Sequence, residues 1–408
     1  MSVAELYKQM NIKGIDPNTF QLLLEISACD LEKPLSKLDV DWRRLLHAIE
    51  SQGISGLAYY YFYHNKDLDY IPQEFKDKLW EYHHFIALHM AEKYQTIKSV
   101  IGLLNERGIS FLVIKGPTVA KTIYPDTSLR FFADLDILAH PGDRKDIHDI
   151  LCTLGYQLEA GYLEPLPKLI PNVVNDHHTR YENLNSKLPI EVHWEDILID
   201  DLVPRDLPAM WRRAVPITIE GVAVKTLCLE DHLLHLCAHA HHHRFEYLYR
   251  ISDLLFILRD HFDEIDWDLF LETVRIEEAQ VPVYFSFRLV SQLYGLALPE
   301  ELMDQLKPDS LRRWLHEHFF KPTFLVVEDQ EDEIPFSFKS TPWIKSTLLN
   351  LLLMSRRIEK IQYLVRLIFP SNEWIRQRYQ VSYDKSLIPY YVLRYFLPTD
   401  LMDNMMSK

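Results

Sequence analysis

The spacing of apolar and polar residues divides the chain into three parts. Residues 1–105 place apolar side chains at helical intervals, and a long helical pattern from about residue 72 ends at Arg107-Gly108, a basic last turn followed by glycine. Residues 106–226 show short apolar runs and strict alternation, which are typical of strands. Helical spacing returns in residues 227–408. The pattern predicts an α/β or α+β core between an N-terminal and a C-terminal helical region.

Several stretches of the central part are predicted strands. They are residues 109–114 and 134–138, a hairpin of 177–183 with 188–195, and a shorter hairpin of 217–219 with 222–225. A helix is expected over residues 144–154. In the first hairpin apolar and polar residues alternate strictly, which places Glu191, His193 and Glu195 on one face of their strand.

Composition narrows the functional classes. The net charge of −15 over 408 residues argues against a general nucleic-acid binder, because affinity for nucleic acid depends on Lys and Arg at the phosphates. The four cysteines are scattered without a CxxC pair, so we expect reduced thiols and neither a disulfide framework nor a zinc knuckle. Residues 1–10 lack the features of a signal peptide, and no apolar run is long enough to span a bilayer. These features predict a cytoplasmic protein.

The strongest chemical signal lies in residues 111–140. One apolar run stops at Lys115-Gly116-Pro117, and a second contains two carboxylates, Asp134 and Asp136. Alternate residues of a strand share a face, so these carboxylates are expected to lie side by side. Two like charges that close are costly unless a positive group lies between them, and a divalent metal ion is a common solution. The alternative is an aspartate pair at a solvated strand end.

Glu191 supplies a third carboxylate on another predicted strand. Two carboxylates on one strand and a third on a neighbouring strand form the set that a two-metal phosphoryl-transfer site needs. The alternatives are that Glu191 is a solvated hairpin residue, and that Lys115 and Arg130 only pair with the two aspartates in a structural ion cluster. His193 fits a structural or supporting role better than a catalytic one.

These residues carry a resemblance to a known family. The chain resembles the nucleotidyltransferase superfamily, with its DNA polymerase beta-like fold, and specifically a poorly characterised bacterial family of that superfamily. There, one strand ends in a glycine-containing turn, a second carries Asp-x-Asp and a third carries one more acid. The matching stretches here are Ile114-Lys115-Gly116-Pro117, Ala133-Asp134-Leu135-Asp136 and Ile190-Glu191-Val192-His193-Trp194. The similarity extends over about residues 35–380, and it is strongest over 111–195.

The resemblance implies an α+β fold with a nucleotidyltransferase-like mixed β-sheet core flanked by the two helical regions. It also implies transfer of a nucleoside monophosphate from an NTP to an acceptor, with release of pyrophosphate. Asp134, Asp136 and Glu191 would be catalytic and would bind Mg²⁺ or Mn²⁺, with Glu191 as a candidate general base. The acceptor would be a small molecule, a sugar, a protein or an RNA end.

The same resemblance assigns nucleotide binding to four residues. Gly116 would let backbone amides approach the phosphates, because no side chain is in the way. Lys115 and Arg130 would supply positive charge to the triphosphate. The family commonly has Gly or Ser after this glycine, whereas Pro117 lacks an amide donor, and Thr118 is the candidate replacement for the missing hydroxyl.

Three functional classes remain open at this point. The first is an active nucleotidyltransferase, which the three acids favour. The second is a catalytically degenerate nucleotide-binding protein, which Pro117 and the low glycine content favour. The third is a structural partner in a biosynthetic or toxin–antitoxin type assembly.

The C-terminal part carries a histidine stripe on a helix expected to begin near residue 229. His232, His235, His239 and His242 fall on one side of that helix. Their i, i+4 spacing suits metal ligands, but no acid completes an HExxH motif, so a partly exposed or cleft-lining face is favoured over a zinc site. Further on, the acidic run 328–333 fits a solvated loop, and residues 343–369 fit a packed amphipathic helix with basic edges.

Overall fold

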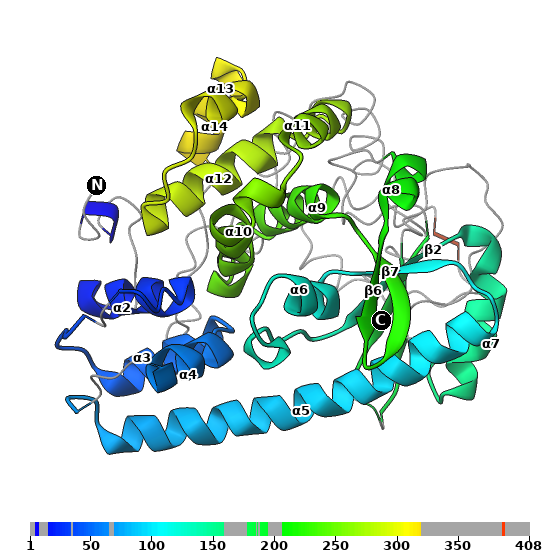
Figure 1. The fold of residues 1–408 in the computed structure, drawn as a ribbon, viewed down its shortest axis with the longest axis horizontal. Coiled ribbons are helices and arrows are strands. Elements are labelled where there is room, and N and C mark those ends of the chain that lie inside the picture. Colours follow the sequence, from blue (N-terminus) through cyan, green and yellow to red (C-terminus); the bar gives the residue numbers. More distant parts are fainter. Residues whose placement is uncertain are drawn as a thin grey trace.

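The structure is a computed structural model. It describes residues 5–7, 15–33, 36–64, 69–158, 178–184, 186, 188–194, 206–319 and 386–387. In these residues a seven-stranded mixed sheet lies between helices that precede it and helices that follow it along the chain (Figure 1). The predicted α+β class is confirmed. Glu195, the acidic run 328–333 and the amphipathic segment 343–369 lie outside the described residues.

The N-terminal helices are capped by aspartates and lead into one long helix. They are α2 (Pro17–Ala28), α3 (Trp42–Ser51), α4 (Ser55–His64) and α5 (Gln73–Glu106). The Asp16 and Asp41 side chains accept backbone N–H bonds at the starts of α2 and α3, which satisfies donors that have no partner inside a helix. The 34 residues of α5 give a length of about 50 Å. This helix therefore extends from the other N-terminal helices to the sheet (Figure 1).

The sheet has the strand order β3-β4-β5-β2-β1-β7-β6. Its strands are β1 (Phe111–Ile114), β2 (Leu135–Ala139), β3 (Gln157–Leu158), β4 (His178–Glu182), β5 (Ile190–His193), β6 (Val215–Ile219) and β7 (Val222–Thr226). Strand β2 pairs antiparallel with β1 and parallel with β5, so the sheet is mixed. Both predicted hairpins are confirmed, as β4–β5 and β6–β7. Observed strand ends differ from the predicted ones by one or two residues.

The two faces of the sheet have different partners. Val113, Leu135 and Ile137 share a core with Ile97 on α5, and α7 (Arg144–Thr153) contributes to the same core. The alternate residues of these strands, such as Ile114 and Leu138, face the other way, toward Met210 on the short helix α8 (Leu207–Arg213). Period-two alternation therefore places Asp136 on the face opposite α5.

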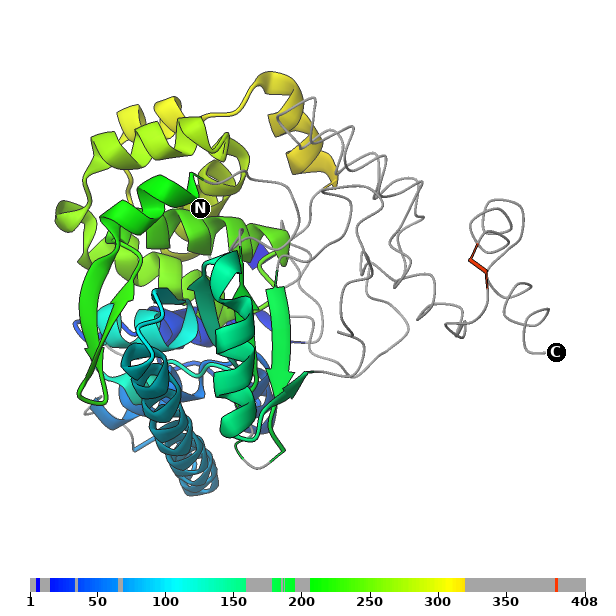
Figure 2. The same cartoon turned by 90° about the vertical axis from the view of Figure 1, so that its right-hand side faces the viewer.

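The C-terminal helices pack on the N-terminal ones. They are α9 (Leu229–His242), α10 (Leu248–Asp260), α11 (Trp267–Ile276), α12 (Gln280–Tyr294), α13 (Glu300–Leu306) and α14 (Ser310–Phe319). Phe20 and Leu45 from the N-terminal region belong to one hydrophobic core with Leu254, Phe270 and Phe287. Figure 2, turned by 90°, shows the green-to-yellow C-terminal helices above the strands and α5 pointing toward the viewer below them. Two helical regions that are distant in sequence thus form a single layer beside the sheet.

A strongly buried ion pair joins the loop before β2 to the C-terminal helices. Arg130, in the loop before β2, donates to Asp253 on α10 from Nε and from Nη2, each at 2.8 Å to the nearer oxygen. Tyr124 donates its hydroxyl to the same carboxylate at 2.7 Å. The Asp253 side chain is 1% exposed. The loop that leads into β2 is therefore anchored to the C-terminal helices.

No helix among the described residues is long and apolar enough to cross a bilayer. The four cysteines are free thiols, as predicted.

Candidate active site

Two neighbouring strands, β2 and β5, bring two of the three predicted carboxylates together. In the register of the sheet Asp136 on β2 lies beside Ile114 at the end of β1 and beside Glu191 on β5. His193 follows Glu191 by two residues and so shares its face. One ligand atom from each of Asp136, Glu191 and His193 lies within 4.8 Å of the others. Among the described residues, this is the one group of His, Cys, Asp and Glu side chains spaced to hold a metal ion.

Asp136 is the most enclosed of the acids, at 2% exposure. Its Oδ1 accepts a hydrogen bond from Lys115 Nζ at 2.7 Å and lies 3.0 Å from His193 Nε2. Burial by itself disfavours the charged carboxylate, but the Lys115 ammonium and the His193 contact outweigh it and lower the pKa of Asp136 to about 2. Asp136 is therefore ionised at neutral pH.

Asp134 lies one residue before β2 and is partly exposed. Burial and the nearby charges of Asp136 and Glu191 raise its pKa to about 6. Such a shift is expected when carboxylates crowd together without enough positive charge between them. Asp134 thus feels the charges of the other two acids, but it is not part of the group of side chains spaced to hold a metal ion.

The turn after β1 presents Lys115 to the acids. Lys115 has φ 56° and ψ −132°, in the left-handed half of backbone space, where a residue with a side chain is strained. Burial opposes the charge of this ammonium group, but Asp136 more than offsets it, so the pKa of Lys115 is raised. Gly116 follows, and a Cβ added there would lie 2.5 Å from Cβ of Phe132. The glycine is thus needed for close packing against the loop that leads to Asp134.

Two further cations stabilise this arrangement. Arg180 on β4 donates from Nη1 to Oε1 of Glu191 at 2.6 Å. Lys93 on α5 is buried and donates from Nζ to the carbonyl oxygens of Phe132 and Ala133, the two residues before Asp134. Burial lowers the pKa of Lys93 to about 8. Arg180 thus orients the Glu191 carboxylate directly, whereas Lys93 holds the main chain that leads to Asp134.

The other two residues predicted to bind nucleotide have protein partners in the structure. Thr118, on α6 (Gly116–Thr122), donates its hydroxyl to the Lys115 carbonyl oxygen at 2.9 Å and lies 3.3 Å from His232 Nε2. The guanidinium of Arg130 is bonded to Asp253. Lys115 and Gly116 therefore lie at the acids, whereas Arg130 anchors the loop before β2 to α10. Nucleotide binding by Thr118 and Arg130 stays a prediction.

The sequence matches a family model described as "Uncharacterised nucleotidyltransferase" over residues 39–295, more than half of the chain. The chain belongs to this family. Among solved structures, a similar one is the solution structure of the antibiotic-resistance factor ANT(2'')-Ia, with a TM-score of 0.30 and 13% sequence identity, covering 48% of this chain and 94% of that chain. No curated protein matches the chain. The family assignment therefore rests on the sequence match.

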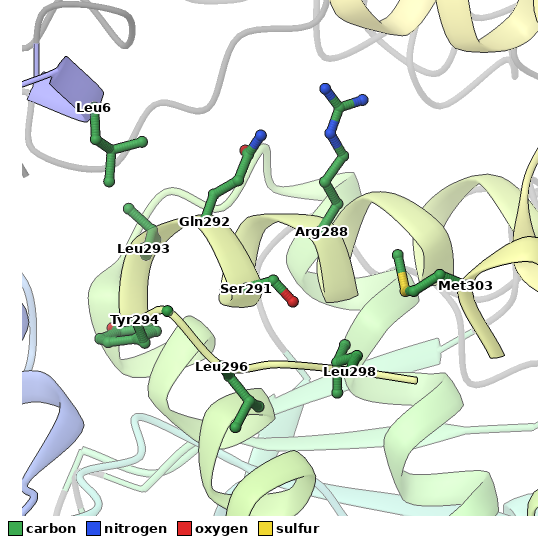
Figure 3. A pocket seen from close by; sticks show the side chains of 10 residues that line it. Leu6, Arg288, Ser291, Gln292, Leu293, Tyr294, Leu296, Leu298 and Met303 are labelled. Carbon is green, nitrogen blue, oxygen red and sulfur yellow. The ribbon is translucent and has the colours of Figure 1, made fainter. Parts of the chain in front are cut away.

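The family-matched region also contains a cavity beside the acid-bearing loop. Its volume is about 310 Å³, and its lining includes Ala133, Phe131, Tyr82 and Tyr249 together with Glu50. A larger cavity of about 620 Å³ lies on α12 and α13, with Leu293, Leu298, Met303 and Arg288 in its lining (Figure 3). The smaller cavity adjoins the loop before Asp134 through Ala133, but its lining includes none of Asp134, Asp136, Glu191 and His193.

Sequence reasoning missed Lys93 and Arg180. It gave His193 a structural or supporting role, and the structure places this ring against Asp136. The alternation that placed Glu191 and His193 on one face was a sufficient signal for His193, whose side chain is 2% exposed and bonded to Asp136. Lys93 lies within a long helical pattern, and the carbonyl oxygen that it contacts belongs to Phe132, 39 residues further along the chain. Nothing local in the sequence distinguishes it from the exposed lysines of the same helix.

Proposed function

We propose that this protein is a metal-dependent nucleotidyltransferase that moves a nucleoside monophosphate from an NTP to an acceptor. The observation that carries the proposal is the convergence of Asp136, Glu191 and His193 within 4.8 Å. Membership of the nucleotidyltransferase family supports it. In this reaction an acceptor oxygen forms a bond to the α-phosphorus, the bond to the β-phosphate oxygen breaks, and pyrophosphate leaves with the bonding electrons.

The donor atoms suit a hard divalent cation. Asp136 and Glu191 offer carboxylate oxygens, which Mg²⁺ and Mn²⁺ prefer, and a histidine nitrogen is acceptable to Mn²⁺. Asp134 would join them, because a cation among these oxygens offsets the repulsion that raises its pKa. When bound, the metal supplies charge neutralisation to the phosphate oxygens.

Residues of the chain itself would bind the phosphates and accept the proton. Lys115 keeps Asp136 ionised and brings a positive charge to the phosphates. Arg180 orients Glu191, the third acid, which we assign to receive the acceptor proton. The cavity lined by Ala133 has a volume within the range of about 300–1,000 Å³ that is usual for small-molecule sites.

A second candidate is a nucleotide-binding protein without turnover. It is favoured by the 2.7 Å ion pair of Lys115 with Asp136, which already neutralises one of the acids, and by Pro117, which removes a backbone donor. In that case NTP binds but pyrophosphate is not released.

The deciding experiment is incubation of purified protein and cell extract with each α-labelled NTP and Mg²⁺ or Mn²⁺. Asp136→Asn and Glu191→Gln are the test variants, and Asp149→Asn, an exposed carboxylate on α7, is the matched control. We expect label on an acceptor with the wild type and with Asp149→Asn, and none with the two test variants. Binding of NTP without any labelled product would establish the second candidate. If neither binding nor labelling responds to Asp136→Asn and Glu191→Gln, the protein is a structural partner.

A further inference from the structure

The histidine stripe of α9 runs past the turn that carries Lys115. His232 Nε2 lies 3.3 Å from the hydroxyl oxygen of Thr118, and Thr118 follows Lys115 by three residues. Further along α9 the rings of His235 and His239 are 6.0 Å apart, and those of His239 and His243 are 4.6 Å apart. His239 and His243 keep part of their surface exposed. The row of rings therefore starts at α6 and ends in side chains that a ligand can reach.

A largely buried arginine lies close enough to the end of this row to influence His243. Arg250, in the first turn of α10, has a side chain that is 11% exposed and a guanidinium 5.3 Å from the ring of Tyr247. Its Nε donates to the Tyr249 hydroxyl at 3.2 Å. Its Nη1 is buried and has no hydrogen-bond partner among the described residues, and the Glu246 carboxylate is 3.7 Å away, beyond hydrogen-bond distance. A buried guanidinium N–H without an acceptor is costly, so this nitrogen points to an acceptor supplied by a ligand.

Two cations, Lys115 and Arg250, lie close enough to His239 and His243 to lower the pKa values of both rings. Burial lowers the pKa of His239, and Lys115 and Arg250 lower it further. Burial and Arg250, followed by His242 and Lys115, lower the pKa of His243 to about 3. Both rings are therefore neutral, and the ammonium and the guanidinium lie close enough to influence them. Neutral imidazoles offer hydrogen bonds but do not compensate these two cations.

A metal ion does not fit this place. The described residues contain no metal-spaced group that includes an α9 histidine. Two neighbouring cations would also repel a divalent ion. The zinc alternative raised by the sequence is thus disfavoured, and an anion with several acceptor oxygens is the complementary ligand.

We propose that Arg250, with His239 and His243, binds the β- and γ-phosphates of the NTP and then the pyrophosphate that leaves. The proposal deepens the proposed nucleotidyl transfer and rests on it. Lys115 connects the two halves of the site, since its Nζ is bonded to Asp136 and its charge reaches both histidines. Arginine suits phosphate because its planar guanidinium donates two parallel hydrogen bonds. The strands then supply the acids, and the C-terminal helices supply the polyphosphate subsite.

The test is calorimetric titration of the full chain with Mg²⁺-tripolyphosphate, a probe that does not depend on the base, and with each of the four NTPs. Arg250→Gln and Arg250→Lys are the test variants, and Arg275→Gln, an exposed arginine on α11, is the control. We expect Arg250→Gln to weaken tripolyphosphate and NTP binding about tenfold or more and Arg250→Lys to weaken them less. Binding of a nucleoside monophosphate should change less than about twofold, and Arg275→Gln should behave as wild type. Because Arg250→Gln also removes the contacts of the guanidinium with Tyr249 and Glu246, we expect a lower melting temperature, and binding is measured below it.

The outcomes separate this inference from the proposed function. If Arg250→Gln binds tripolyphosphate and NTP as the wild type does, while Asp136→Asn loses NTP binding, the subsite is refuted and the nucleotidyl-transfer site stands. If the wild type binds no NTP, both are refuted. Should Arg250→Gln fail to fold, His239→Asn provides the second variant, with the same expected loss of tripolyphosphate affinity and the same refuting result.

Discussion

The side-chain Nζ of Lys93 lies 2.7 Å from the carbonyl oxygen of Phe132, so the long helix α5 holds the loop that leads to Asp134. A second bond, of 3.1 Å, runs from the same nitrogen to the carbonyl of Ala133. The ammonium also lies 4.7 Å from the centre of the Phe131 ring. One lysine thus fixes three consecutive residues next to the acids from the opposite face of the sheet.

Replacing Lys93 by methionine should disturb the site more than the fold. The variant leaves two carbonyl oxygens without their charged donor, which we expect to lower the free energy of unfolding by about 1–3 kcal/mol. Displacement of Asp134 should also lower NTP-dependent label transfer by about tenfold or more, since small misplacements of reacting groups are costly. Urea unfolding and the labelling assay measure the two effects. Lys98→Met, at an exposed position of the same helix, should change neither. Wild-type labelling by Lys93→Met would show that the loop needs no anchor.

Gly116→Ala tests the close contact at the turn after β1. The added methyl group would lie 2.5 Å from Cβ and 2.9 Å from Cγ of Phe132, so the loop before Asp134 has to move. Overpacking of this kind typically costs about 1–3 kcal/mol of stability. We expect thermal unfolding at a lower temperature and a loss of label transfer. Gly142→Ala is the matched control, because nothing lies within 4 Å of its added Cβ. Equal melting temperatures for the two variants would contradict the packing argument.

The Arg130–Asp253 pair should be essential for stability. Asp253→Asn leaves a buried guanidinium without its counterion, and breaking a buried pair in this way typically costs about 3–5 kcal/mol. The pair Lys145–Asp149 on α7 is the control, since its side chains are 84% and 57% exposed and solvent screens their attraction. Chemical denaturation of Asp253→Asn and Asp149→Asn measures both. A loss below about 1 kcal/mol in Asp253→Asn would rule out the anchoring role.

Buried histidines should make the protein sensitive to mild acid. His232 is 2% exposed, and burial lowers its pKa to about 4. Because the folded-state pKa lies below the unfolded value of about 6.5, the stability that the neutral ring supports is present above pH 6.5 and is lost as the pH falls toward 4. The slope for one proton is about 1.4 kcal/mol per pH unit.

His232→Gln isolates this contribution. Its loss of unfolding free energy between pH 7 and pH 5 should be smaller than that of the wild type by about 2 kcal/mol, because one fewer proton is taken up on unfolding. Urea denaturation at the two pH values gives the difference. His47→Gln, at an exposed position on α3, should keep the wild-type dependence on pH. An unchanged dependence in His232→Gln would mean that this ring does not resist protonation.

The sequence by itself determined the elements and part of the site. Period-two alternation identified β5 and the face shared by Glu191 and His193, and the Asp-x-Asp spacing identified β2. These signals are local, because side-chain direction in a strand follows directly from residue number. Placing Asp136 beside Glu191 needed only that the two strands be neighbours, which the family resemblance implied and the register of the sheet shows.

Only the tertiary structure decided the partners of the cations and the arrangement of the helices. Arg130, expected at the triphosphate, is bonded to Asp253, which lies 123 residues further along the chain. The histidines of α9 have Lys115 and Arg250 as neighbours, which turns an apparent metal-ligand pattern into a candidate anion site. Local periodicity specifies which face of an element is apolar but not which element covers it. The counterion of a buried charge depends on that packing, so these pairings were not readable from sequence spacing.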